Sequence, residues 1–390
     1  MIPYGRQTVS RADIAAVEAV LRSDFLTQGP VVPAFEQALC DYCGAAYGVA
    51  VNSATSALHL ACLALGLGAG DWLWTTPITF VASANCGRYC GAEIDFVDID
   101  PKTYNLSVDA LEYKLQQAER VGKLPKIVIP VHFAGLSCDM AAIYALSQRY
   151  GFAIIEDASH ALGGAYRGDK IGGSRYSDIT VFSFHPVKMI TTGEGGVAMT
   201  NRAELADKMA RLRSHGITRD PALMTHSPDG SWYYQQLELG FNYRMTDIQA
   251  ALGLSQLQRL DQFIAKRRDI AAQYRQQLQG LPLTWQQVGD DFSSSWHLFV
   301  IEVLAGRAQR DSLFNHLRKS DIGVNLHYIP LYHQPYYQQA VVEYSSFNAA
   351  ECYYQRALSL PLFPELTDAA QQVVIKQIYE SCPDDQNRES

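Results

Sequence analysis

Short apolar runs alternate with helical patterns through the first half of the chain, and this alternation limits the fold more than any other feature. Apolar runs typical of buried strands cover residues 48–51, 72–75, 94–97, 126–131, 153–156 and 178–184. Helical patterns lie at 10–24, 32–43, 80–89, 107–120 and 140–150. Strands joined through helices pair in parallel, and helices then cover both faces of the sheet. The sequence therefore predicts an α/β fold with a mostly parallel sheet.

The C-terminal part has a different pattern. One long amphipathic helical pattern at 246–279 ends at a Gly-Leu-Pro turn, and is followed by a strand at 296–303 and helices near 307–319 and 367–379. A chain of 390 residues, 48% of them hydrophobic, is long enough to build two cores. We expect a large domain at residues 1–250 and a smaller α+β domain at residues 251–390.

Charge and hydropathy exclude several kinds of partner. Acidic residues number 40 and basic residues 32, and the one tight basic cluster is Lys266-Arg267-Arg268. This balance argues against nucleic acid as a partner. The N-terminal segment lacks the apolar core of a signal peptide, and no stretch is long and apolar enough to cross a bilayer. We expect a cytoplasmic protein that does not bind membranes.

Cys40 and Cys43, two of the eight cysteines, have the spacing of a metal or redox site. A zinc site needs a second pair, and Cys86 and Cys90 are separated by three residues in a helical pattern. Reduced cysteine often packs as a small hydrophobic side chain. We therefore expect buried free thiols and no metal, while a role for Cys40 and Cys43 stays open.

Lys188 is the first candidate for catalysis. It follows the predicted strand at 178–184, in a turn made by Pro186. Sites of α/β proteins lie at strand ends of this kind. Aromatic and apolar neighbours exclude water from the lysine, which disfavours the ammonium and leaves an amine able to attack a carbonyl. Taken alone, a solvated lysine in a surface loop is the alternative.

Three further segments place polar or aromatic residues at the ends of predicted elements. Asp157 follows the run at 153–156, where a carboxylate either meets a cation or caps the next helix. Residues 52–59 open a helix whose unpaired N–H groups suit a phosphate, although such residues also cap helices for stability alone. Phe80 follows the strand at 72–75 and either covers a flat ligand or belongs to the core.

Together these segments resemble the site of aminotransferases that use pyridoxal 5′-phosphate (PLP). The sequence is similar, from Ile2 to Pro364, to sugar aminotransferases of the DegT/DnrJ/EryC1/StrS family. The motifs that carry the resemblance are Ser-Phe-His-Pro-Val-Lys ending at Lys188, Thr-Thr-Gly-Glu-Gly-Gly ending at Gly196, Asp-Ala-Ser-His-Ala beginning at Asp157, Asn52 to Leu58, and Gly-Phe-Asn-Tyr-Arg ending at Arg244. The resemblance implies the fold type I of aspartate aminotransferase.

The resemblance also implies roles for individual residues. Lys188 would bind PLP covalently and, once released, carry a proton between substrate and cofactor, while Asp157 would keep the pyridine nitrogen protonated. Phe80 would stack on one face of the ring, and His160 would hold the other side or the phenolic oxygen. The cofactor-binding residues implied are Lys188, Asp157, His160, Ala54, Thr55, Ser56, Phe80, Ser183 and Asn242, with the phosphate at Ala54, Thr55, Ser56 and Ser183. Asn242 would come from a second copy, so a homodimer with shared active sites is expected.

The substrates implied by the resemblance are L-glutamate as amino donor and a UDP-linked 4-keto-6-deoxy-N-acetylhexosamine, aminated at C4, as in pseudaminic acid biosynthesis. The substrate-binding residues implied are Tyr4, Asp24, Phe25, Leu26, Thr27, Asn325, Leu326, His327 and Tyr328. The donor, the nucleotide base, the sugar stereochemistry and the aminated carbon stay open. An aminotransferase for a different nucleotide-linked keto sugar is the alternative.

Three other functions fit parts of the sequence. A related sugar dehydratase has a histidine in place of the lysine, and a PLP-fold protein without transaminase activity would have lost Lys188 or Asp157. A nicotinamide dehydrogenase needs a glycine-rich turn after its first strand, where this chain has Asn-Ser-Ala-Thr-Ser. The presence of Lys188 and Asp157 favours transamination.

Overall fold

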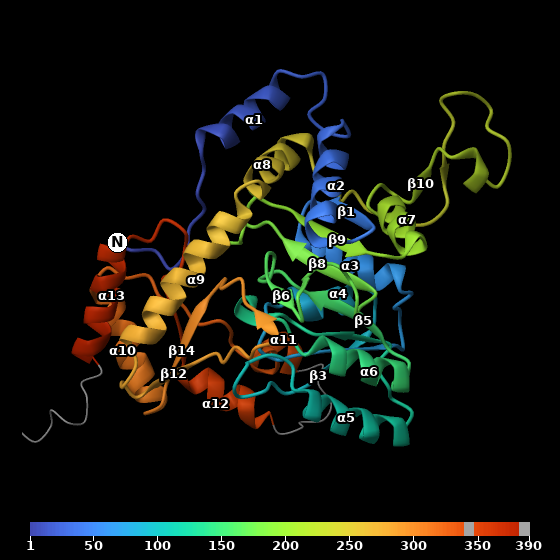
Figure 1. The fold of residues 1–390 in the computed structure, drawn as a ribbon. Coiled ribbons are helices and arrows are strands. Elements are labelled where there is room, and N and C mark those ends of the chain that lie inside the picture. Colours follow the sequence, from blue (N-terminus) through green and yellow to red (C-terminus); the bar gives the residue numbers. More distant parts are fainter. Residues whose placement is uncertain (339–346, 382–390) are drawn as a thin grey trace, which may run out of the picture.

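The computed structural model describes residues 1–338 and 347–381 (Figure 1). Its centre is a seven-stranded sheet in the order β1-β9-β8-β5-β4-β2-β3. The strands are β1 (Tyr47–Val51), β2 (Trp72–Thr75), β3 (Glu93–Phe96), β4 (Ile127–Ile129), β5 (Ala153–Asp157), β8 (Ile179–Ser183) and β9 (Gly196–Thr200). β3, β2, β4, β5 and β8 pair in parallel. The predicted α/β fold with a mostly parallel sheet is confirmed.

β9 runs against its neighbours, pairing antiparallel with both β8 and β1. Each strand predicted for this sheet is present, but β9 was not predicted, and β1 pairs with it rather than with a parallel neighbour. The strand is buried along its whole length. Its start shares the glycine-rich run that follows Lys188, and glycine is depleted in strands, so the sequence there favoured a loop.

Helices cover both faces of the sheet, as predicted. The face that carries Ile155 packs against α3, α4 and α7, and the opposite face, with Ile154, packs against α5 and α6. Successive strand residues point to opposite faces, so Asp157 shares the face of Ile155, and Glu156 that of Ile154. The bounds are α2 (Val31–Cys43), α3 (Ala54–Ala64), α4 (Ala82–Tyr89), α5 (Val108–Arg120), α6 (Met140–Tyr150) and α7 (Ala203–Leu212).

The helical pattern predicted at 246–279 is two helices, α8 (Asp247–Leu257) and α9 (Leu260–Gln277). Arg259, at the break, donates to the buried Asp13 carboxylate of α1 (Arg11–Leu21) over 2.5 Å. α8 packs against α1 and α2, whereas α9 contributes to a second hydrophobic cluster. Asp13 and the other partners of α8 and α9 are distant in the sequence, so an amphipathic pattern alone does not predict the break between the two helices.

The second cluster is built on an antiparallel sheet of order β12-β14-β15. Its strands are β12 (Leu283–Trp285), β14 (Phe299–Val303) and β15 (Ala357–Leu360), and nearby helices are α10 (Arg307–Lys319), α12 (Asn348–Arg356) and α13 (Asp368–Ser381). Ile2 also packs against this cluster, through a bridge to Ile322. The N-terminal segment therefore lies against the C-terminal sheet, while the division at residue 250 stays a prediction.

The remaining elements are short. They are β6 (Ala165–Tyr166), β7 (Asp169–Lys170), β10 (Ile217–Thr218), β11 (Gln235–Gln236), β13 (Phe292–Ser293), α11 (Pro335–Gln338) and 3₁₀ turns at Phe133–Gly135, Pro221–Leu223 and Leu331–His333. Cys40 and Cys43 are buried free thiols, as expected. Within residues 1–338 and 347–381, no His, Cys, Asp and Glu group could hold a metal ion. None of the helices in these same ranges has the length and apolar character that a membrane span requires.

Candidate active site

Lys188 lies in the turn between β8 and β9, at the end of the parallel strands. Its N–H donates to the His185 carbonyl over 2.9 Å, and Thr192 N–H donates to the Phe184 carbonyl over 3.0 Å, so the turn is closed. Burial lowers the pKa of Lys188 to about 8, although the charge of Asp157 opposes this shift. Its amine is therefore more readily neutral than that of an exposed lysine, while its catalytic role stays a prediction.

Asp157, the last residue of β5, is buried on the sheet face that α3 and α4 cover. Its Oδ2 accepts a hydrogen bond from Ser83 Oγ at 2.6 Å, and its Oδ1 accepts from Ser159 N–H at 3.1 Å. Both carboxylate oxygens are thus oriented by donors of the same chain. Asp157 also acts electrostatically on Lys188, as expected for two groups that share a site.

His160 and Tyr328 lie beside this pair. Ala134 N–H donates to His160 Nδ1 over 3.3 Å, which leaves the proton of the neutral ring on Nε2, 3.2 Å from the Tyr328 hydroxyl. Burial and the charges of Lys188 and His327 hold the pKa of His160 well below its usual value. His160 is therefore a neutral hydrogen-bonding group.

Tyr4 and His327 complete the same group of side chains. Their rings lie 5.6 Å apart, and His327 Nδ1 is 2.8 Å from Ser359 Oγ. Burial and the charge of Lys188 lower the pKa of His327 to about 3. The structure thus brings together Lys188, Asp157, His160, Tyr4, His327 and Tyr328, which come from four distant parts of the sequence.

The start of α3 lies directly against the strand that follows the Lys188 turn. A Cβ on Gly196 would lie 2.5 Å from Ala54 N, so only glycine fits there, and Gly196 pairs with Ser183 across β8 and β9. The Ser53 hydroxyl accepts from Ser56 N–H at 3.1 Å, and the Ser56 hydroxyl donates to Asn52 Oδ1 at 2.7 Å. Ala54 and Thr55 are therefore better placed than Ser56 to offer N–H groups to a phosphate.

Phe80 precedes α4 and is 57% exposed, with its ring 6.3 Å from that of Tyr328. It is therefore not a core residue, which was the alternative explanation. Its carbonyl accepts from Ser83 N–H at 3.2 Å, so the loop that presents Phe80 also fixes the residue that binds Asp157.

Other residues of the predicted site have different neighbours within the chain. Asp24, Phe25, Leu26 and Thr27 are exposed and lie beside the start of α8, where Asp247 N–H donates to the Leu26 carbonyl over 3.0 Å. Asn242 is exposed and bridges to Ser214. Asn325 pairs with Ser359, and neither it nor Leu326 is buried. A role for these residues in binding stays a prediction.

Sequence reasoning missed Thr79, Ser83 and His297. Thr79 and Ser83 lie four residues apart around Phe80, and this spacing is their only sequence signal. His297 is buried, with its ring 4.3 Å from that of His160, yet it belongs to the C-terminal part of the chain. Nothing local in the sequence links it to the site.

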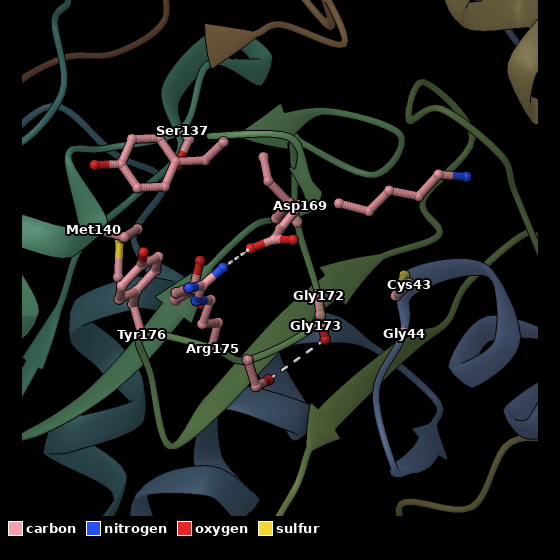
Figure 2. Close-up of a pocket in the computed structure, with 14 residues that line it drawn as sticks. Cys43, Gly44, Ser137, Met140, Asp169, Gly172, Gly173, Arg175 and Tyr176 are labelled. Atoms are coloured by element: carbon pink, nitrogen blue, oxygen red, sulfur yellow. Dashed lines mark hydrogen bonds and ion pairs between the residues drawn. The ribbon is translucent and has the colours of Figure 1, made fainter. Parts of the chain in front are cut away.

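A cavity of about 300 Å³ lies on the opposite face of the sheet (Figure 2). Its lining includes Glu156, Ser137 and Met140, and also Arg175 and Asp169, which form an ion pair 2.6 Å long. None of the predicted site residues lines this cavity. Asp157 and Glu156 are adjacent, but they point to opposite faces, so the cavity is separate from the Lys188 site.

The sequence model of the DegT/DnrJ/EryC1/StrS aminotransferase family matches residues 7–379. This chain belongs to that family. It is 38% identical over 369 residues to the UDP-4-amino-4,6-dideoxy-N-acetyl-beta-L-altrosamine transaminase of Campylobacter jejuni, covering 94% of this chain and 93% of the relative.

Solved structures agree with this assignment. PseC of Helicobacter pylori, an aminotransferase involved in the biosynthesis of pseudoaminic acid, is 31% identical with a TM-score of 0.89, covering 98% of this chain and 99% of PseC. The putative sugar aminotransferase Spr1654 of Streptococcus pneumoniae, in its PMP form, is 29% identical with a TM-score of 0.89, over 98% and 99% of the two chains. Spr1654 is also known in a PLP form. The fold is therefore that of PLP-dependent aminotransferases, and PLP is the cofactor.

The residues present fit this cofactor. Lys188 offers an amine of lowered pKa, Asp157 a buried carboxylate on the same face of the sheet, and the start of α3 offers N–H groups beside Ser183. An aldehyde, a pyridine nitrogen and a phosphate need these three kinds of partner.

Proposed function

We propose that this sugar aminotransferase moves an amino group from L-glutamate to C4 of a UDP-linked 4-keto-6-deoxy-N-acetylhexosamine, a step of pseudaminic acid biosynthesis. The names of the Campylobacter transaminase and of PseC support this substrate. Spr1654 is equally similar in structure and is named only a putative sugar aminotransferase, so a different nucleotide-linked keto sugar is the alternative. The observation that carries the catalytic part is the position of Lys188 in the turn after β8 and of Asp157 at the end of the neighbouring strand β5, and burial also lowers the pKa of Lys188.

Each side chain of the site has a proposed task. Lys188 binds the cofactor through its amine and later carries the proton at the substrate carbon, because a group with a pKa near 8 both accepts and donates protons near neutral pH. Asp157 binds the pyridine nitrogen, and the first N–H groups of α3, together with Ser183, bind the phosphate. PLP, when bound, supplies the electron sink for the reaction.

We propose that aromatic groups at the edge of this site bind the nucleotide sugar. Tyr4, His327 and Tyr328 lie in ring contact, and Phe80 approaches Tyr328 with more than half of its surface exposed. Flat side chains of this kind stack on a uracil and on the apolar face of a pyranose. The neutral state of His160 and His327 suits hydrogen bonds to hydroxyl groups.

We also propose a homodimer in which each site takes residues from both copies. Two groups of large apolar side chains are exposed: Phe25 (54%) and Leu26 (48%) before α2, and Trp232 (75%) and Leu239 (80%) on the segment around β10 and β11, which projects from the molecule in Figure 1. Such surfaces favour a protein partner. In this dimer, Asn242 of one copy would contact the cofactor phosphate in the site of the other.

We keep a cytoplasmic location as part of the proposal. The cysteines of residues 1–338 and 347–381 are free, and cysteine stays reduced most readily in the cytoplasm.

Product analysis tests the substrate. The purified protein, loaded with PLP, is incubated with L-glutamate and a panel of UDP- and dTDP-linked 4-keto and 3-keto sugars, and products are read by mass spectrometry and NMR. The proposal expects amination at C4 of the UDP-linked N-acetylhexosamine and formation of 2-oxoglutarate. Preference for a dTDP-linked or 3-keto sugar would favour an aminotransferase for a different nucleotide-linked keto sugar. If no sugar is aminated, the proposed transaminase activity is wrong.

A further inference from the structure

The hydroxyl groups of Thr79 and Ser83 form a chain of hydrogen bonds that ends at the Asp157 carboxylate. Ser83 Oγ donates to Asp157 Oδ2 over 2.6 Å, and Ser83 Oγ is 2.7 Å from Thr79 Oγ1. Thr79 is 2% exposed, Ser83 0% and Asp157 5%, so water does not compete for these bonds. The three residues come from β5 and from the loop and first turn of α4, which carry no other part of the proposed cofactor site except Phe80.

The direction of the hydrogen bonds follows from the carboxylate. An ionised carboxylate only accepts, so the Ser83 proton points to Asp157, and the Ser83 oxygen is then the acceptor for the Thr79 hydroxyl. Each bond polarises the next, because buried hydrogen bonds in a chain strengthen one another. Thr79 therefore acts on Asp157 although it does not touch it.

We infer that Ser83 is a positioning residue for the cofactor, with Thr79 supporting it. Their hydrogen bonds hold the Asp157 carboxylate in the orientation that aims it at the pyridine nitrogen of PLP. This inference rests on the proposed role of Asp157. A hydrogen bond to a carboxylate is stronger than one between neutral groups, so it fixes the orientation of the acceptor more firmly.

The position of Ser83 in the chain supports this role. Its N–H donates to the Phe80 carbonyl over 3.2 Å, and its carbonyl accepts from Cys86 Sγ at 3.4 Å. The Ser83 backbone is thus held at both its N–H and its carbonyl, and neither contact uses the hydroxyl that donates to Asp157. One turn fixes both Phe80, which we propose stacks on the ring of PLP, and Ser83, which orients Asp157. The positions of these two residues are therefore coupled.

Cofactor binding tests the inference without any measurement of turnover. Apo-protein is titrated with PLP and with an analogue that has a carbon in place of the pyridine nitrogen, and the dissociation constants are compared. Replacement of Ser83 by alanine is expected to weaken PLP binding by about tenfold, the effect of one hydrogen bond to a charged group. Binding of the analogue, which offers Asp157 no partner, is expected to change by less than about twofold.

Thr79 provides the matched pair of variants. Thr79→Val keeps the shape and removes the hydroxyl, so PLP binding weakens in the same direction, whereas Thr79→Ser keeps the hydroxyl and binds PLP as the unchanged protein does. In the Ser83→Ala background, Thr79→Val adds nothing further, because its effect passes through Ser83. Melting temperatures show whether each variant is folded.

The outcomes separate this inference from the proposal on which it rests. Equal weakening of PLP and analogue in Ser83→Ala, or no weakening of either, would overturn the positioning role. Asp157→Asn is the reference: it should bind PLP and the analogue almost equally. If Asp157→Asn prefers PLP over the analogue as strongly as the unchanged protein does, the proposed role of Asp157 fails. If Asp157→Asn loses this preference but the Ser83 and Thr79 variants keep it, Asp157 keeps its role and the inference on Ser83 fails.

Discussion

Gly196 and Ala54 are in backbone contact: a Cβ on Gly196 would lie 2.5 Å from the nitrogen of Ala54. This contact joins the first residue of β9 to the first residue of α3. It sets the proposed phosphate-binding turn against Ser183, the register partner of Gly196 at the end of β8. The spacing between Lys188 and the start of α3, which we propose bind the aldehyde and the phosphate of PLP, therefore depends on residue 196 having no side chain.

Gly196→Ala should push α3 away from β9. We expect a loss of stability of about 1–3 kcal/mol, typical of overpacking, and weaker retention of PLP. Chemical unfolding and PLP titration measure the two effects. Gly68→Ala is the control, because a Cβ there meets nothing within 4 Å and the backbone is not left-handed. Equal behaviour of both variants would show that the contact is not needed.

Uptake of PLP by the apo-protein should follow the titration of Lys188. The ammonium cannot attack an aldehyde, so the initial rate should rise with pH through a midpoint near 8, far below that of an ordinary lysine. The charge of Asp157 raises the pKa of Lys188, so Asp157→Asn should move the midpoint to lower pH. Stopped-flow absorbance gives these rates. A midpoint near 10 would contradict the burial of the amine.

The pair formed by His132 and Glu156 should contribute to the pH dependence of stability. His132 Nε2 lies 2.6 Å from Glu156 Oε2, and both are buried. Cys138 N–H donates to His132 Nδ1 over 3.2 Å, which leaves the proton of the neutral ring on Nε2, where it donates to Glu156. Burial raises the pKa of Glu156, but His132, Ser177 and Thr180 bring it below its usual value. The Glu156 contribution is thus present above the usual pKa of a glutamate and is lost as pH falls through the lowered value.

His132→Phe removes the N–H donor of the buried Glu156 carboxylate, so we expect a loss of about 1–3 kcal/mol at neutral pH. The difference from the unchanged protein should shrink as pH falls below about 4.5, where Glu156 begins to take up a proton, measured by urea unfolding. Adding Glu156→Gln to His132→Phe should recover part of the loss. A difference that does not change in acid would mean that His132 does not stabilise the Glu156 charge.

Mixing two inactive variants tests the shared site. Asn242→Ala should bind PLP poorly, and Lys188→Ala should be inactive but folded. After the subunits are mixed and reassociated, half of the dimers are mixed and half of their sites have both residues, so about a quarter of full activity should return. Absence of any recovery would favour sites built from one chain.

The parallel sheet was predictable because buried strands and their crossover helices leave strong local patterns, and Lys188 and Asp157 were predictable because they follow such strands. β9 was not, because its start lies in the glycine-rich run after Lys188, and the break at Arg259 was not, because its partner Asp13 is distant in the sequence. Ser83 and His297 were missed because their partners are also distant in the sequence: Ser83 donates a hydrogen bond to Asp157, and the His297 ring contacts that of His160. The strand at 72–75 pointed to Phe80 and the family resemblance to Tyr328, and the structure places their rings 6.3 Å apart.

The most direct test of the central claim is to fix the cofactor to the protein and find where it is attached. The protein is loaded with PLP, reduced with borohydride, digested, and its peptides are sequenced by mass spectrometry. Our account predicts the reduced cofactor on Lys188, and its absence after Lys188→Ala. Labelling of another lysine, or of none, would contradict it.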